Sequence, residues 1–166
     1  LARLTMPFVD VLDVALIKCI MSFRSDVFSQ IIVDITNIIS LPVIILITIL
    51  FSAVLLAAEK RFSSFLCISS ISVGLILLVA FKNIFEFQRP SSALIDVTSF
   101  GFPSGHAAIA TIFFLFITYL FKQTSHRKIF RTLFYFVIIC MIVAVGLSRV
   151  YLGVHFPSDV VGGYAL

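Results

Sequence analysis

Four long stretches without a charged side chain dominate this sequence. The two longest run from Ile35 to Ala58 and from Phe62 to Phe81, and shorter ones cover residues 107–121 and 132–148. A helix needs about 20 residues to cross the roughly 30 Å hydrocarbon core of a bilayer. Because the stretches are rich in Ile, Leu, Val and Phe and lack hairpin turn signals, they predict helices rather than barrel strands. The expected fold class is therefore all-α, a polytopic transmembrane helical bundle.

The composition also indicates that a bilayer is the solvent. Hydrophobic residues make up 61% of the 166 residues and charged residues 12%, with a mean hydropathy of +1.19. Soluble domains lie nearer half apolar and a quarter charged. The net charge of +4 is modest and the basic residues fall between apolar runs, so no nucleic-acid partner is expected. Cys19, Cys67 and Cys140 are far apart and are expected to be inert packing residues.

One membrane-embedded domain is expected over residues 1–166. Because the chain starts at Leu1 and stops inside an apolar run, we expect this domain to be incomplete at both ends. An interfacial N-terminal segment is predicted over residues 1–34, since charges interrupt residues 8–28 and favour a helix lying at the membrane surface. Spans are predicted near residues 35–58, 62–88, 106–121, 132–149 and 157–166.

Basic residues are concentrated in two short connections that lie on the same side of the predicted bundle, residues 59–61 and 122–131. The positive-inside rule makes that side cytoplasmic. The opposite side, periplasmic or extracellular in a bacterial inner membrane, then receives residues 1–34, 89–104 and 150–156. His126 in the second basic connection is expected to be an ordinary solvated residue.

Three short segments hold most of the polar residues that a membrane pattern does not explain. They contain Lys82, Arg89, Ser104, Gly105, His106, Arg149, His155 and Asp159. Lys82 and Arg89 are seven residues apart, which on a helix is about two turns and predicts a shared face. All three segments lie at span ends on the outer side. Ionisable groups near membrane depth are costly, so their convergence indicates a functional site.

The residue types in these segments suit phosphate chemistry. Three basic side chains can hold the non-bridging oxygens of a phosphate dianion and stabilise charge in the transition state. Ser104 and Gly105 open a helix, where unpaired backbone N–H groups favour an anion. A neutral histidine can attack phosphorus, and Asp159, four residues after His155, can orient its ring if a helix begins there. The few carboxylates and the lack of HxxH spacing predict no metal and no cofactor.

Taken together, the segments resemble the signature of the type 2 phosphatidic acid phosphatase family, which shares its core with vanadium haloperoxidases. That signature is Lys, six residues, Arg-Pro; then Pro-Ser-Gly-His; then Ser-Arg, five residues, His, three residues, Asp. Residues 82–159 match every fixed position in order. The resemblance implies six spans, of which the first and the end of the last lie outside this chain.

The resemblance also implies a role for each matched residue. His155 would form a phosphohistidine with Asp159 orienting it, and His106 would act as acid and base. Phosphate would be bound by Lys82, Arg89, Ser104, Gly105 and Arg149. Glu86 and Asp96, on the same side, are expected mainly to pair with nearby cations.

The predicted function is hydrolysis of a phosphomonoester or pyrophosphate group on a membrane lipid, without a metal. Candidate substrates are phosphatidic acid, phosphatidylglycerol phosphate, undecaprenyl pyrophosphate and the phosphates of lipid A. Three alternatives stay open: a lipid phosphotransferase that uses the same histidine, a vanadium haloperoxidase, and a non-catalytic lipid-binding or transport protein. The residues do not select a lipid or an oligomeric state.

Overall fold

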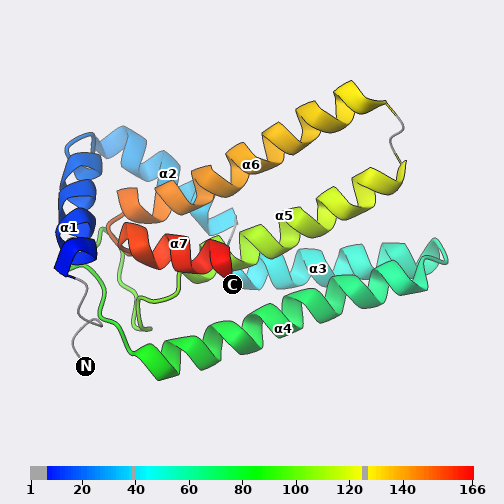
Figure 1. Cartoon of the computed structure of the whole chain (residues 1–166), viewed down its shortest axis with the longest axis horizontal. Helices are drawn as coiled ribbons and strands as arrows, with labels where there is room; N and C mark the ends of the chain where they lie inside the picture. Colours follow the sequence, from blue (N-terminus) through cyan, green and yellow to red (C-terminus); the bar gives the residue numbers. More distant parts are fainter. Residues whose placement is uncertain (1–6, 39, 125–126) are drawn as a thin grey trace.

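The structure, a computed structural model, describes residues 7–38, 40–124 and 127–166. Within these ranges the chain forms seven helices and no strand (Figure 1). Their bounds are α1 (Pro7–Met21), α2 (Asp26–Ile38), α3 (Leu41–Ala57), α4 (Arg61–Phe85), α5 (Gly105–Thr124), α6 (Lys128–Tyr151) and α7 (Pro157–Ala165). His126 lies outside the described residues.

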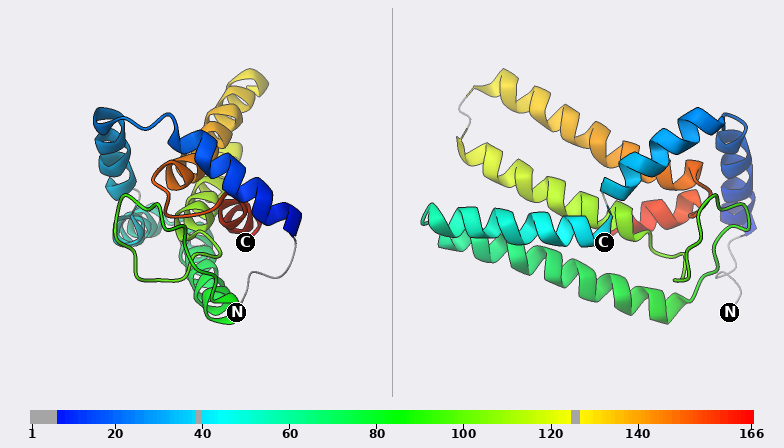
Figure 2. Two further views of the ribbon diagram at one scale, coloured as in Figure 1. Left: turned by 90° about the vertical axis from the view of Figure 1, so that its left-hand side faces the viewer. Right: turned by 180° about the vertical axis from the view of Figure 1, so that it is seen from behind.

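The long helices α3 to α6 run lengthwise through the molecule, with α5 at the centre in contact with α3, α4, α6 and α7 (Figure 1). One end carries the α3–α4 and α5–α6 connections. The other end carries α1, the long connection between α4 and α5, and the start of α7 (Figure 2). The three segments singled out in the sequence are therefore gathered at one end of the bundle.

The surface of the bundle is as apolar as its interior. Ile44, Ile71 and Ile109 form one buried cluster between α3, α4 and α5, whereas Ile76 and Phe136 are more than 60% exposed. Among the described helices, α4, the Gly105–Lys122 part of α5, and α6 are long and apolar enough to cross a membrane. The bent pair α2–α3 would make a fourth span. The predicted all-α transmembrane bundle is confirmed.

Two predicted helix boundaries are wrong. The span expected over residues 35–58 is broken, because α2 ends at Ile38 and α3 starts at Leu41 with a 41° bend between them. Pro42 stands at the start of α3, where its ring and missing N–H prevent α2 from continuing. The span expected over residues 62–88 ends at Phe85, and Glu86 follows in the left-handed conformation with φ 49°. Arg89 therefore lies in a loop and shares no helical face with Lys82.

The N-terminal segment also differs from the single surface helix that was expected over residues 8–28. It forms α1 and α2 with a turn between them, and both pack onto α6. Asp13 is only 2% exposed and accepts hydrogen bonds from the Ser158 N–H at 2.9 Å and the Ser158 hydroxyl at 2.5 Å. In the turn, Arg24 Nε donates to the carbonyl of Tyr151 at 2.8 Å. These contacts attach the segment to the end of the bundle that carries the polar motifs.

Candidate active site

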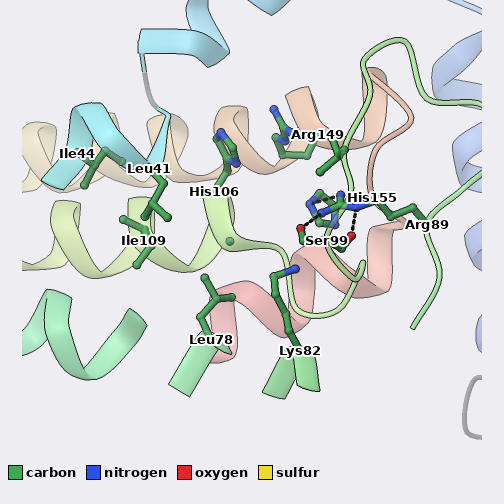
Figure 3. A pocket seen from close by; sticks show the side chains of 12 residues that line it. Leu41, Ile44, Leu78, Lys82, Arg89, Ser99, His106, Ile109, Arg149 and His155 are labelled. Carbon is green, nitrogen blue, oxygen red and sulfur yellow. Dashed lines mark hydrogen bonds between the residues drawn. The ribbon is translucent and has the colours of Figure 1, made fainter. Parts of the chain in front are cut away.

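The predicted cations and histidines line one cavity of roughly 170 Å³ at the α1 end of the bundle (Figure 3). Three of these residues come from helix ends: Lys82 from the last turn of α4, Arg149 from the last turn of α6, and His106 from the first turn of α5. Arg89 and His155 come from the connections. Apolar side chains complete the wall on the side toward the membrane interior, namely Leu41, Ile44, Leu78 and Ile109.

The His155 ring lies between the Arg89 guanidinium at one nitrogen and the Asp159 carboxylate near the other. Its side chain is 2% exposed, and Nε2 lies 3.0 Å from Nη1 of Arg89. Because a guanidinium only donates, Nε2 is the acceptor and the ring proton resides on Nδ1. Nδ1 lies 3.6 Å from Oδ2 of Asp159, which is close enough for an ion pair but too far for a hydrogen bond, and that oxygen accepts the Phe156 N–H at 2.8 Å. The ring therefore presents a lone pair, not a proton, to the cavity.

His155 reaches Asp159 although the expected helix does not include it. The helix α7 begins at Pro157, so His155 lies in the connection before it. The Asp159 side chain accepts from the N-cap backbone of its own helix, and its backbone carbonyl accepts the Ser104 N–H at 2.9 Å. The same residue therefore lies next to the histidine and holds the start of α5.

Arg149 and Ser104 present buried donors that no described residue satisfies. Arg149 is 3% exposed, and neither its Nε nor its Nη1 has a hydrogen-bond partner among the described residues; the same is true of the hydroxyl of the fully buried Ser104. An unsatisfied buried donor costs about 1–3 kcal/mol, and more when it is charged, so native structures rarely leave one without a reason. These donors indicate a site built for an anion with several acceptor oxygens.

The other two cations are held in place by backbone carbonyls of the α4–α5 and α6–α7 connections. Lys82 Nζ donates to the carbonyl of Phe100. Arg89 donates to the carbonyl of Ser99 at 2.7 Å and to that of Val154 at 2.6 Å. Burial lowers the pKa of the Arg89 guanidinium, while Asp159 opposes this shift. The α4–α5 connection thus positions its own arginine over the cavity instead of leaving it to reach into water.

Burial also lowers the pKa of His155 to about 4; Asp159 opposes the shift, and Arg89 and Arg149 add to it. Since the ring titrates near 6.5 when unfolded, the unfolded state binds the proton more tightly, and stability falls as pH drops from 6.5 toward 4. We expect the melting temperature of the wild type to fall more steeply across this window than that of His155→Gln. Thermal unfolding of both proteins in detergent at pH 7, 5.5 and 4.5 gives these melting temperatures. The same fall in melting temperature for the wild type and for His155→Gln would contradict the prediction.

Sequence reasoning missed two features of this site. Ser99 accepts two hydrogen bonds from Arg89, through its carbonyl from Nε at 2.7 Å and through its hydroxyl from Nη2 at 3.0 Å, and no sequence pattern marks that serine. Asp13 holds the start of α7 through Ser158, and its one signal was a carboxylate in a largely apolar stretch. Glu86 and Asp96 are exposed and line neither this cavity nor its apolar wall.

Comparison with known proteins places this geometry in a family. The profile of the PAP2 superfamily matches residues 62–166, which include all three motifs. The chain belongs to the PAP2 superfamily. The family resemblance predicted from the motifs is thereby confirmed, and the PAP2 assignment makes the chain an integral-membrane protein of the lipid phosphatase class.

Individual relatives of this PAP2 chain agree. Phosphatidylglycerophosphatase B of Bacillus subtilis (strain 168) is 30% identical over 156 residues, which are 93% of this chain and 77% of the relative. The crystal structure of a transmembrane PAP2 type phosphatidylglycerolphosphate phosphatase from Bacillus subtilis superposes with a TM-score of 0.87 at 27% identity, covering 99% of this chain and 82% of the other. Aquifex aeolicus LpxE, at 22% identity and a TM-score of 0.72 over 93% of this chain and 88% of its own, shares the fold.

Proposed function

We propose that this PAP2 protein hydrolyses the phosphomonoester of a membrane glycerophospholipid, with phosphatidylglycerol phosphate as the first candidate. The unsatisfied buried donors of Arg149 and Ser104, together with a histidine whose Nε2 lone pair faces the Arg89 guanidinium, carry the proposal. They fit an anion with several oxygens next to a nucleophile. The relative and the neighbour named for phosphatidylglycerol phosphate direct the choice of lipid.

In the proposed reaction, Nε2 of His155 attacks phosphorus while the bond to the lipid oxygen breaks. The attack forms a phosphohistidine, and the leaving oxygen takes a proton from His106. Asp159 stabilises the positive charge on the ring through Nδ1–H. His106 then removes a proton from water, which attacks phosphorus and releases phosphate and free His155. Binding of phosphate oxygens draws the Arg89 donor away from Nε2 and frees its lone pair.

The chain's own cations would supply the electrostatic stabilisation. Lys82, Arg89 and Arg149 surround the position of the transferred group, where charge spreads over three equatorial oxygens in the transition state. Donors preorganised in a buried site stabilise that charge without further rearrangement. We therefore expect the reaction to proceed without a metal ion.

The placement of the site supports a substrate that remains in the bilayer. The cavity lies at the end of the bundle opposite the basic connections, so the positive-inside rule puts it at the periplasmic or extracellular face. Its wall toward the membrane interior is apolar. A lipid head group at that depth can reach the cations while its chains stay in hydrocarbon.

The test is phosphate release by the full-length protein in mixed micelles from phosphatidylglycerol phosphate, phosphatidic acid, undecaprenyl pyrophosphate and lipid A. We expect release in the presence of EDTA, fastest from phosphatidylglycerol phosphate. Release from none of these lipids would refute the proposal. Transfer of labelled phosphate to a lipid acceptor, with no free phosphate, would assign a phosphotransferase instead.

The role of His106 predicts a dependence on the leaving group. His106→Ala removes the acid that protonates the departing oxygen, so substrates with poor leaving groups should lose most. We expect kcat/KM for a lipid phosphate, whose leaving group is an alcohol, to fall about 10²–10⁴-fold. The leaving group of p-nitrophenyl phosphate needs no proton, so kcat/KM for this substrate should fall at least tenfold less. An equal loss on both substrates would argue against the acid role.

A further inference from the structure

A second, larger cavity of roughly 540 Å³ lies between α2 and α6. These two helices pack against each other at the end of the bundle that carries the active site (Figure 2). On α6 the lining extends from Met141 to Tyr151, about 15 Å at 1.5 Å per residue. Most of the lining is aliphatic or aromatic, including Ile31, Ile35 and Ala144. We call this cavity the α2–α6 groove.

His106 is the residue that joins the groove to the active site. The active-site cavity is lined by both His106 and His155, whereas the groove is lined by His106 and not by His155. In phosphoryl transfer the attacking and leaving oxygen or nitrogen atoms lie roughly in line on opposite sides of phosphorus. With His155 attacking and His106 at the leaving oxygen, the rest of the lipid continues beyond His106, into the groove.

A buried hydroxyl in this apolar groove has no partner within the part of the chain that the structure describes. Thr36, near the end of α2, is 5% exposed, and its hydroxyl makes no hydrogen bond to a described residue. Buried hydroxyls on helices usually donate to a carbonyl of their own helix. Thr48 does so to Ile44 at 2.7 Å, and Ser148, which also lines the groove, does so to Val145 at 2.6 Å. The Thr36 hydroxyl is thus left available to a ligand.

We propose that the α2–α6 groove binds one acyl chain of the lipid substrate and that Thr36 donates a hydrogen bond to the ester carbonyl of that chain. This inference rests on the proposed function and narrows its substrate class. A diacylglycerol phosphate carries an ester carbonyl a few bonds from the phosphate, at the junction of head group and chain. A polyprenyl phosphate is hydrocarbon from its first carbon and gives Thr36 no acceptor.

The first test fills the groove. Ala144 lines it and has an exposed side chain, so Ala144→Phe places a ring where the chain would lie. We expect kcat/KM for dioleoyl phosphatidic acid in mixed micelles to fall at least tenfold, while that for the water-soluble p-nitrophenyl phosphate stays within twofold. Ala53 on α3 is also exposed and lines neither cavity, so Ala53→Phe is the matched control and should change neither value.

The second test removes only the donor. Thr36→Val keeps the shape of the side chain and deletes its hydroxyl. We expect kcat/KM to fall three- to tenfold on diacyl phosphatidic acid and to stay within twofold on the dialkyl ether analogue, which has no carbonyl. An equal effect on both lipids would overturn the role of Thr36.

A third measurement uses the unaltered protein, so it does not depend on whether a variant folds. Phosphatidic acid with a diazirine in one acyl chain is photolysed in the micelle, and the labelled peptides are identified by mass spectrometry. Labels on α2 and on Met141 or Ala144 support the proposal. Labels confined to other helices overturn it, and so would labels that show another segment of the protein occupying the groove.

The two proposals fail in different ways. A wild type that is inactive on every phosphomonoester would refute the proposed function. An active wild type whose kcat/KM for dioleoyl phosphatidic acid is unchanged by Ala144→Phe would refute only the groove as a binding site.

Discussion

Replacing His155 with alanine is expected to reduce phosphate release from a lipid phosphomonoester on the order of 10³-fold or more. Removing a covalent nucleophile leaves only the part of catalysis that comes from binding and electrostatics. The lone pair of Nε2 faces Arg89 in the cavity that also holds the other cations. Steady-state phosphate release by the purified full-length variant measures the loss.

The variant must be shown to be folded, because His155 is buried between two helix ends. His155→Ala keeps Arg149 and Lys82, so it should still bind vanadate, which mimics the transferred group. With the wild type, rapid acid-free quenching during turnover of a ³²P-labelled lipid should trap label on the protein, and His155→Ala should trap none. Turnover near the wild-type rate in this variant would eliminate the nucleophile assignment.

Arg149→Ala is expected to have the next largest effect, a loss of about 10²–10³-fold in kcat, the size found for other preorganised donors in buried sites. Among the described residues, Nε and Nη1 of Arg149 have no hydrogen-bond partner, and the residue lines the cavity where we propose that phosphate binds. Arg149→Lys should recover little of the activity. An ammonium group is a point charge and cannot reproduce two donors in a fixed plane.

A matched arginine on the same helix controls for the change in charge. Arg131 lies in the first turn of α6, at the opposite end from the cavity, so Arg131→Ala should stay within twofold of the wild type. The inhibition constant of vanadate should rise in parallel with the loss of turnover in Arg149→Ala. Vanadate inhibition that is unchanged in Arg149→Ala would show that this guanidinium does not hold the phosphate.

The sequence was sufficient to predict the bundle and the cations and histidines that line the cavity. Successive helices that cross a membrane alternate in direction, so the order of the spans predicts which helix ends lie on the same side of the membrane. Motifs at those ends are then expected to lie close together. The residues that stand out against an apolar background, such as Lys82, His106 and Arg149, are the ones that line the cavity. Their catalytic roles remain predictions until the variants are measured.

The sequence did not predict the irregular backbone that carries these residues. Helical spacing placed Lys82 and Arg89 on one face, but the helix ends at Phe85, and Arg89 reaches the site from a loop that its own hydrogen bonds shape. The break before α3 depends on whether Pro42 starts a new helix or kinks a continuous one, and the sequence is compatible with both outcomes. The groove between α2 and α6 depends on tertiary packing of a segment that was expected to lie flat on the membrane.

The contact between Asp13 and Ser158 has a consequence for how the enzyme matures. The two residues are 145 positions apart, so the loop that carries His155 is completed only when the first and last described helices have met. Contacts of such long range form late, because the entropy of closing a large loop must be overcome first. Helices inserted into the bilayer during synthesis would therefore form an inert bundle, and we expect the ability to cleave phosphate to appear only once α7 has packed against α1.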